Sequence, residues 1–160
     1  MNVSAASPLF KAMLAAAGTA LLTPPALAQK QTVFYQGPVE KRGTERAAYQ
    51  KLILDLAHIW ADCDTDLMRR IFTEDVDFSY PGRRIIGRDA ALADLAEFCK
   101  VATERSIYFP KDAFYIDTRN GRVAGEGQFR VTQNGAKQVD NDVWVATVGK
   151  GRSALTKEYL

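Results

Sequence analysis

The stretch from Trp60 to Leu95 reads WADCDTDLMRRIFTEDVDFSYPGRRIIGRDAALADL, and its pattern decides the fold. It begins with the end of one amphipathic helix and continues through a short second helix. Residues Val76 to Tyr80 then alternate apolar and polar side chains, as a half-buried strand does. Pro81-Gly82 turns the chain before a third helix. The stretch therefore predicts two helices, a strand, a turn and a third helix.

A long helix is predicted from Thr44, which caps it, to about Asp62. Its apolar residues recur at helical spacing and form one stripe: Tyr49, Leu52, Ile53, Leu56, Ile59, Trp60 and Cys63. His58, the only histidine, falls on the opposite, polar face between Asp55 and Asp62. We therefore interpret His58 as a solvated surface residue and not as a catalytic base.

After Ser106 the apolar residues recur with period two, which predicts strands. The strands expected are at Tyr108, Ala113–Thr118, Arg122–Gln133, Ala136–Val148 and Ser153–Tyr159. Asn120-Gly121 and Asn134-Gly135 are typical of hairpin turns. Helices followed by an antiparallel meander predict one α+β domain, with three N-terminal helices on one face of a curved antiparallel sheet.

The pattern from Trp60 onward resembles the SnoaL-like families of the nuclear-transport-factor-two-like (NTF2-like) superfamily. The pattern is W, acidic residues, L, IF, an acidic pair, V-x-F-x-x-P-G and then G-R-D-A-A. The resemblance covers Thr44 to Leu160 and implies a cone-shaped fold whose cavity binds small, mostly apolar ligands. The side chains expected to line that cavity are Leu56, Trp60, Phe72, Tyr115 and Trp144. Because this fold hosts isomerases, cyclases, dehydratases, hydrolases and non-enzymes, the resemblance leaves the reaction open.

Asp142 is the first candidate catalytic residue. On its predicted strand it shares a face with Trp144, while Val143 occupies the other face. A desolvated aspartate has a raised pKa. The segment Asn141 to Trp144 also resembles a strand of ketosteroid isomerases in which a protonated aspartate stabilises an oxyanion. The alternative is a structural aspartate that bonds a loop or a helix end, and the sequence leaves both interpretations open.

Tyr80 is the second candidate. A gap-free alignment with the isomerases from Leu56 to Pro81 places Tyr80 at the general-base aspartate and Leu56 at the oxyanion tyrosine. Tyrosine is a poor base near neutral pH, so steroid isomerisation by that mechanism is not expected. Tyr80 is instead expected to donate a hydrogen bond or to form a pocket wall. Tyr115 and Glu126 are secondary polar candidates whose facing the alternation leaves open.

The N-terminus predicts export. Lys11 precedes an apolar run that ends at Leu22, and Ala26-Leu27-Ala28 has the small-x-small pattern of a cleavage site. Residues 1–28 are therefore expected to be a signal peptide, followed by an N-terminal arm at 29–43 and the main domain at 44–160. The arm either packs on the domain at Phe34 or is mobile.

Export changes the interpretation of the two cysteines. In an oxidising compartment a disulfide between Cys63 and Cys99 is chemically allowed, and the alternative is two buried free thiols. Two cysteines without clustered histidines cannot make a zinc site. The acidic cluster around Asp64 lacks the glycine and the distal glutamate of a calcium loop, so no metal is expected.

Composition and motifs exclude several classes of binding partner. The net charge of +2 over 160 residues and the isolated arginine pairs argue against nucleic-acid binding. The N-terminal apolar run is too short to span a membrane. No phosphate-binding or dinucleotide-binding loop is present, so no cofactor is expected. We interpret Gly125-Glu126-Gly127 as a bulge in a curved strand.

Two functional hypotheses follow. The first is an exported pocket domain that binds a small apolar molecule, with or without cofactor-free acid/base catalysis of the isomerase, cyclase or dehydratase type. The second is a non-catalytic dimerising domain with a vestigial pocket. Val139, Val143 and Val145 form an apolar stripe on the face opposite Asp142, which predicts a homodimer through the outer sheet face.

Overall fold

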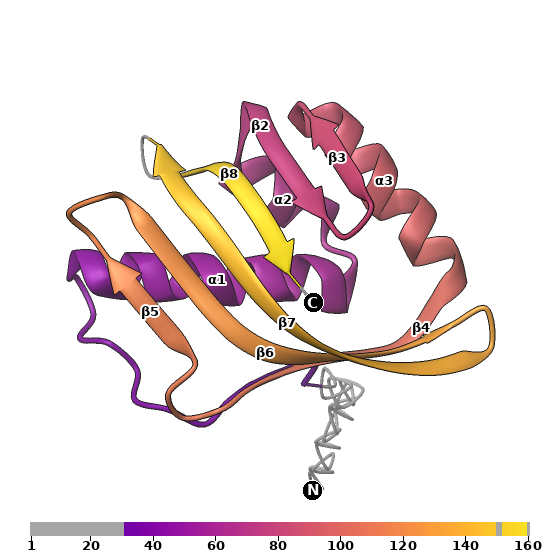
Figure 1. Ribbon diagram of the computed structural model, residues 1–160, viewed down its shortest axis with the longest axis horizontal. Coiled ribbons are helices and arrows are strands. Elements are labelled where there is room, and N and C mark those ends of the chain that lie inside the picture. Colours follow the sequence, from indigo (N-terminus) through magenta and orange to yellow (C-terminus); the bar gives the residue numbers. More distant parts are fainter. Residues whose placement is uncertain (1–30, 150–151, 160) are drawn as a thin grey trace, which may run out of the picture.

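A computed structural model describes residues 31–149 and 152–159 of the chain. The predicted signal peptide, residues 1–28, lies outside these described residues. Within them, three helices pack on one side of a curved sheet, and Figure 1 shows the longest helix crossing behind the strands. The helices are α1 (Glu45–Asp62), α2 (Thr65–Ile71) and α3 (Arg88–Val101).

The described strands form one eight-stranded sheet in the order β1-β4-β6-β7-β8-β2-β3, with β5 beside β6. Their bounds are β1 (Val33–Tyr35), β2 (Phe72–Tyr80), β3 (Arg83–Ile86), β4 (Ala102–Phe109), β5 (Phe114–Asp117), β6 (Arg122–Gln133), β7 (Ala136–Gly149) and β8 (Arg152–Tyr159). The predicted α+β class is confirmed. The sheet is mixed, however, because β1 pairs with β4 and β2 pairs with β8 in parallel. Both parallel pairs join segments far apart in sequence, which local periodicity does not reveal.

The helix ends follow the capping rules. The Thr44 hydroxyl accepts a hydrogen bond from the backbone N–H of Ala47, and the Asp64 carboxylate accepts one from Leu67 at 2.8 Å. Most of the predicted stripe of α1 is buried, with Ile53 and Ile59 fully inaccessible, while Trp60 and Cys63 are partly exposed. The side chain of His58 is 42% exposed, and its Nδ1 atom lies 2.8 Å from a carboxylate oxygen of Asp62, in agreement with the predicted surface position.

Gly125 and Gly127 on β6 do not form the predicted bulge. The pairing of β6 with β7 is unbroken from Arg122 to Gln133. A Cβ at Gly125 would lie 2.6 Å from Ile53, and one at Gly127 would lie 2.7 Å from the ring of Trp144. The two glycines are therefore explained by close approach of large side chains on the inner face.

The N-terminal arm adds strand β1 to the sheet edge. Val33 is buried, but Phe34 is 39% exposed. The arm therefore packs on the domain through Val33 and not through the expected residue, Phe34. The reason is strand alternation, which turns Val33 inward and Phe34 outward. Tyr35 also faces the core and packs edge-on against Phe114 at a ring distance of 4.7 Å.

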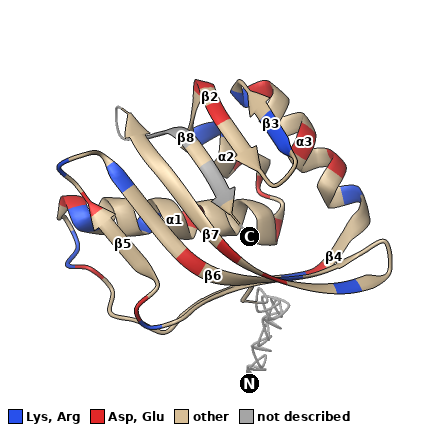
Figure 2. Ribbon diagram, viewed as in Figure 1, with Lys and Arg blue, Asp and Glu red and all other residues tan. Residues whose placement is uncertain are grey.

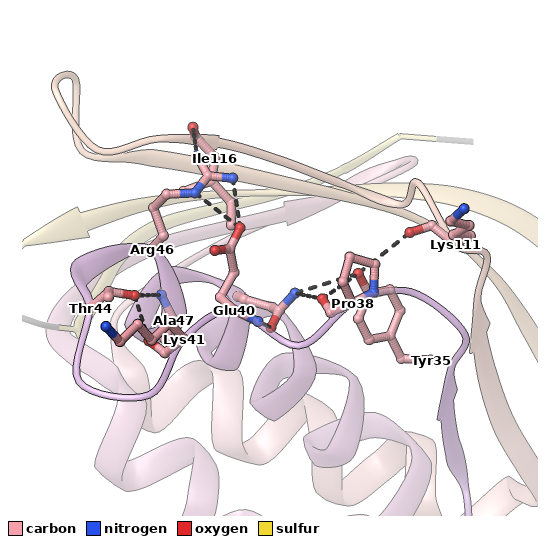
Figure 3. Close-up of polar contacts among 10 residues, drawn as sticks. Tyr35, Pro38, Glu40, Lys41, Thr44, Arg46, Ala47, Lys111 and Ile116 are labelled. Carbon is pink, nitrogen blue, oxygen red and sulfur yellow. Dashed lines mark hydrogen bonds and ion pairs between the residues drawn. The ribbon is translucent and has the colours of Figure 1, made fainter.

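Polar contacts hold the rest of the arm across the start of α1 (Figure 3). Glu40 forms an ion pair with Arg46 at 2.7 Å, and Arg46 also donates to the carbonyl of Ile116 on β5. The buried side chain of Gln50 donates to the carbonyl of Pro38 and accepts from the backbone N–H of Glu40. The arm is therefore fixed to both a helix and the sheet.

Charged residues of both signs are interspersed along the ribbon (Figure 2). The described part of the chain holds no group of three His, Cys, Asp or Glu side chains placed to bind a metal ion. Among its helices, none has the length and hydropathy that crossing a bilayer requires.

Candidate functional site

A cavity of about 410 Å³ opens between α3, the turn from β2 to β3, and the inner face of β6 and β7. Its walls come from several different elements, so no single segment forms it. The lining residues are Trp60, Tyr80, Pro81, Arg83, Asp94, Glu97, Phe98, Val101, Ile107, Phe129, Val131, Gln133, Gln138, Asp140 and Trp144.

Aromatic rings form much of the wall and are held by one another. The ring of Trp60 stacks on Phe78 at 5.6 Å and meets the edge of Phe98 at 5.4 Å. Phe98 in turn contacts Phe129 across the cavity wall at 6.0 Å. Such ring pairs stabilise their arrangement by about 0.5–1.5 kcal/mol each beyond burial, so the apolar wall is preformed.

Asp94 is the buried polar group of this cavity. It lies on α3 and is only 8% exposed. The Tyr80 hydroxyl donates to its carboxylate at 3.1 Å, and the Arg83 guanidinium lies 2.9 Å from its Oδ1 atom. A buried carboxylate requires such partners, because desolvation without them is costly. Tyr80 and Arg83 flank the turn from β2 to β3, so this turn sets the polar end of the cavity.

Tyr80, one of the two predicted catalytic residues, lines the cavity as a hydrogen-bond donor. Burial raises the pKa of its hydroxyl, and the negative charge and hydrogen bond of Asp94 raise it further, while Arg83 acts in the opposite direction. The group therefore stays protonated at neutral pH, which fits donation and does not fit a general base.

Asp94 is a site residue that the sequence prediction missed, although the sequence carries a signal for it. It occupies the same helical stripe as Ala91, Leu95 and Phe98, which are spaced by three and four residues. An acidic residue inside an apolar stripe is unusual unless it is paired. Its position in the stripe was therefore sufficient to mark Asp94 as a buried, partnered carboxylate.

Asp142 is placed differently. It is 2% exposed, and both carboxylate oxygens are buried, as its predicted position beside Trp144 required. It does not line the cavity next to Asp94. The ring of Trp144 packs on Gly127, the residue directly opposite Asp142 on β6. Trp144 reaches the cavity and Asp142 does not.

A second cavity, of about 360 Å³, lies on the outer side of the sheet. Its lining includes Glu126 and Asn141, which are exposed. Asp142, which is buried on β7, also contributes to the lining. Glu126 pairs with Val143, so both share the outer face. The alternation of β7 turns the Asp142 side chain to the opposite face. Glu126 therefore has no contact with the cavity beside Asp94.

The predicted cavity residues divide into two groups. Trp60 and Trp144 line the cavity. Leu56 and Phe72 do not line it and are instead packed within the core between α1 and the sheet. Tyr115 is 58% exposed on β5, where strand alternation turns it away from the core.

A disulfide lies beside the cavity. Cys63 and Cys99 are joined, with Cα atoms 6.1 Å apart, so the distance condition for the predicted bridge is met. Cys63 follows α1 directly and Cys99 is next to Phe98 on α3. The bridge therefore ties together the two helices that carry Trp60 and Phe98.

Neither a protein-family model nor a curated protein matches the chain. Several solved structures do match the chain. A protein described as a polyketide cyclase from Xanthomonas campestris pv. campestris superposes with a TM-score of 0.63 at 19% identity, covering 73% of this chain and 93% of that chain. A protein described as a SnoaL-like polyketide cyclase, from Jannaschia sp. CCS1, superposes with a TM-score of 0.62 at 14% identity, covering 75% of this chain and 90% of that chain.

The fold is nuclear-transport-factor-two-like. An epoxide hydrolase from M. tuberculosis, of the type named LEH-like, has the same fold, with a TM-score of 0.63, 15% identity and coverage of 72% of this chain and 84% of that chain. The predicted resemblance to SnoaL-like proteins is thereby confirmed. At these identities the comparison shows a shared fold and no more, so the reaction of this chain has to be argued from its own cavity.

Proposed function

We propose that this chain is an exported pocket domain that binds a small, largely apolar molecule in the cavity beside Asp94. One observation carries the proposal: a cavity of about 410 Å³ has aromatic rings in its wall and, at one end, a buried carboxylate held by Tyr80 and Arg83. Small-molecule sites in proteins combine hydrophobic and aromatic walls with polar groups that orient the ligand.

The polar end of the cavity favours a ligand with a hydrogen-bond donor. Asp94 offers carboxylate oxygens, which accept hydrogen bonds, and Tyr80 already donates to them. A catalytic form of the proposal is cofactor-free proton transfer of the isomerase, cyclase or dehydratase type. It assigns proton exchange to Asp94, because that carboxylate borders the cavity, and positioning to Tyr80.

Calorimetric titration of the mature protein with indole tests the proposal. Indole is a small apolar molecule with one N–H donor, and we expect saturable binding at one site. Val101→Trp fills the cavity from the end of α3, where Val101 is 39% exposed, and should abolish binding without disturbing the core. Val39→Trp is the matched control, because Val39 is 81% exposed in the arm and outside the cavity. Equal binding by both variants, or none by wild type, would refute the proposal.

Export belongs to the same proposal and is supported by the sequence alone. Cleavage after Ala28 would leave Gln29 as the first residue of the mature chain. N-terminal sequencing of the protein outside the cytoplasm should begin at Gln29, and a chain that begins at Met1 would rule cleavage out.

A non-catalytic dimerising domain is the second candidate function. Val139 is 57% exposed on β7, and Val143 and Val145 are partly exposed on the same outer face. Their partners on β6 include Arg130 and Glu126, so the apolar stripe is one strand wide. Sedimentation should show a dimer that Val139→Lys dissociates. A wild-type monomer at micromolar concentration would contradict this candidate.

A further inference from the structure

We infer that the molecule bound in the cavity beside Asp94 is a hydrophobic cation, an ammonium group carried on an aromatic or aliphatic body. The inference rests on the proposed function, since it concerns the same cavity, and it names the class of ligand. Its basis is the combination of carboxylates and aromatic rings that line one cavity.

The charged lining is predominantly acidic. Asp94, Glu97 and Asp140 provide three carboxylates, and Arg83 is the single cation among the lining residues. Arg83 is committed to Asp94 at 2.9 Å and has a side chain that is 59% exposed. The positive charge of Arg83 therefore offsets the negative charge of Asp94 at the rim. The remaining carboxylates make the net charge of the lining negative.

Asp140 is the carboxylate most available to a ligand. It lies on β7 directly opposite Phe129 and is only partly exposed. Among residues 31–149, no cationic side chain forms an ion pair with it. Glu97 differs, because it is paired with Lys100 at 2.6 Å and is 71% exposed, so water screens its charge. Asp140 is thus placed to attract a cation at the inner surface.

The uncharged part of the lining also favours a cation. Five aromatic residues line the cavity: Trp60, Tyr80, Phe98, Phe129 and Trp144. The faces of such rings attract cations electrostatically, tryptophan most strongly, and the attraction grows when water is excluded. Quaternary and tertiary ammonium groups suit this environment, since their methyl groups pack on rings while the charge is shared with nearby carboxylates.

An anionic ligand fits the same lining poorly. Its carboxylate would meet Asp94 and Asp140 with one guanidinium that already has a partner. Like charges that approach within a partly buried site repel each other strongly, because the dielectric there is lower than in water. A neutral apolar molecule would gain the ring contacts but would gain nothing from the carboxylates.

Three probes of one size separate these cases: phenyltrimethylammonium, its neutral carbon isostere tert-butylbenzene, and phenylacetate. Both tryptophans of the chain line the cavity, so quenching of intrinsic fluorescence reports on this site. We expect phenyltrimethylammonium to bind about tenfold more tightly than tert-butylbenzene, because aromatic rings attract a partly desolvated cation. We expect phenylacetate to bind most weakly of the three.

Asp140→Asn should lower the affinity for phenyltrimethylammonium about three- to tenfold, because the attraction between opposite charges is lost, and leave that for tert-butylbenzene unchanged. The neutral probe thus also verifies that the variant is folded. Asp75→Asn is the matched control, because Asp75 is exposed on β2 and outside the cavity, and both affinities should match wild type.

The outcomes distinguish this inference from the proposed function. Equal affinity for the cation and its neutral isostere would overturn the inference while the apolar pocket stands. Tighter binding of phenylacetate would overturn it as well, and so would a cation preference that Asp140→Asn leaves intact. Failure of all three probes to bind would overturn the proposed function and the inference together.

Discussion

Two regions of this molecule bury an aspartate, and they differ in what surrounds it. At the end of the cavity, Asp94 is held by Tyr80 and Arg83 and borders about 410 Å³ of space between α3 and the sheet. In the middle of the sheet, Asp142 lies on β7, opposite Gly127, where the ring of Trp144 packs closely. Both carboxylates are desolvated, but only Asp94 can meet a ligand without rearrangement of the core.

The difference teaches that burial and access are separate properties. A buried carboxylate suggests chemistry because such groups gather at functional sites. Chemistry also needs a place for the reacting molecule within hydrogen-bond reach. The Asp94 region satisfies both conditions, and the Asp142 region satisfies the first.

The largest expected effect concerns the disulfide that borders the Asp94 region. Replacing both cysteines, Cys63→Ser with Cys99→Ser, should lower the free energy of unfolding by about 3–4 kcal/mol, because the bridge closes a loop between residues separated by 36 in sequence. Chemical denaturation measures this. A reducing agent should lower the stability of wild type equally and leave the double variant unaffected. Detection of two free thiols in the unfolded, unreduced protein would remove the basis of this prediction.

A smaller effect tests the close packing of the Asp142 region. Gly127→Ala adds a Cβ at 2.7 Å from the Trp144 ring and should cost about 1–3 kcal/mol of stability, the usual range for overpacked cores. Because Trp144 also lines the cavity, its displacement should weaken indole binding too. Gly135→Ala, at an open hairpin turn with φ of +81°, serves as a comparison that strains the backbone without touching the ring. Unchanged stability and binding in Gly127→Ala would show that the two regions are not coupled through Trp144.

The smallest effect concerns pH. Burial and the charge of Asp94 raise the pKa of Tyr80 above the ordinary value of 10.0. A raised folded-state pKa means that the folded state holds the proton more tightly than the unfolded state. The resulting stability is fully present below pH 10.0 and is lost as the pH rises through the folded pKa. Tyr80→Phe should therefore reduce the loss of melting temperature above pH 10.0. The pKa values of Tyr35 and Tyr49 are also raised by burial, so part of the loss should remain. If Tyr80→Phe and wild type lost melting temperature equally as the pH rises, the raised pKa of Tyr80 would be contradicted.

Much of the fold could be predicted from periodicity. The bounds of β6 and the start of β7 agree with the sequence prediction, and Thr44 caps its helix as expected. Asn134-Gly135 forms the predicted hairpin turn, with φ of 50° and 81°. Strand β1 was missed, because a three-residue strand that pairs in parallel with a distant segment leaves no local pattern.

The candidate site was only partly predictable, for a physical reason. Trp60 and Trp144 were found because apolar stripes turn them inward, and the same stripes turn Leu56 inward as well. Whether an inward residue lines the cavity or is covered by the core depends on how far the helices stand from the sheet. That distance is set by tertiary packing, so alternation predicted the burial of Asp142 but not its separation from the cavity.

The measurement that most directly tests the central claim is chemical-shift mapping of the ¹⁵N-labelled mature protein during titration with indole. It reports which of the two regions meets a ligand and needs no variant. The account predicts that the largest changes fall on the amides of Asp94 and Phe98 and on the indole N–H groups of Trp60 and Trp144. Largest changes around Tyr108, Gln128 and Asn141, which line the second cavity, would contradict it.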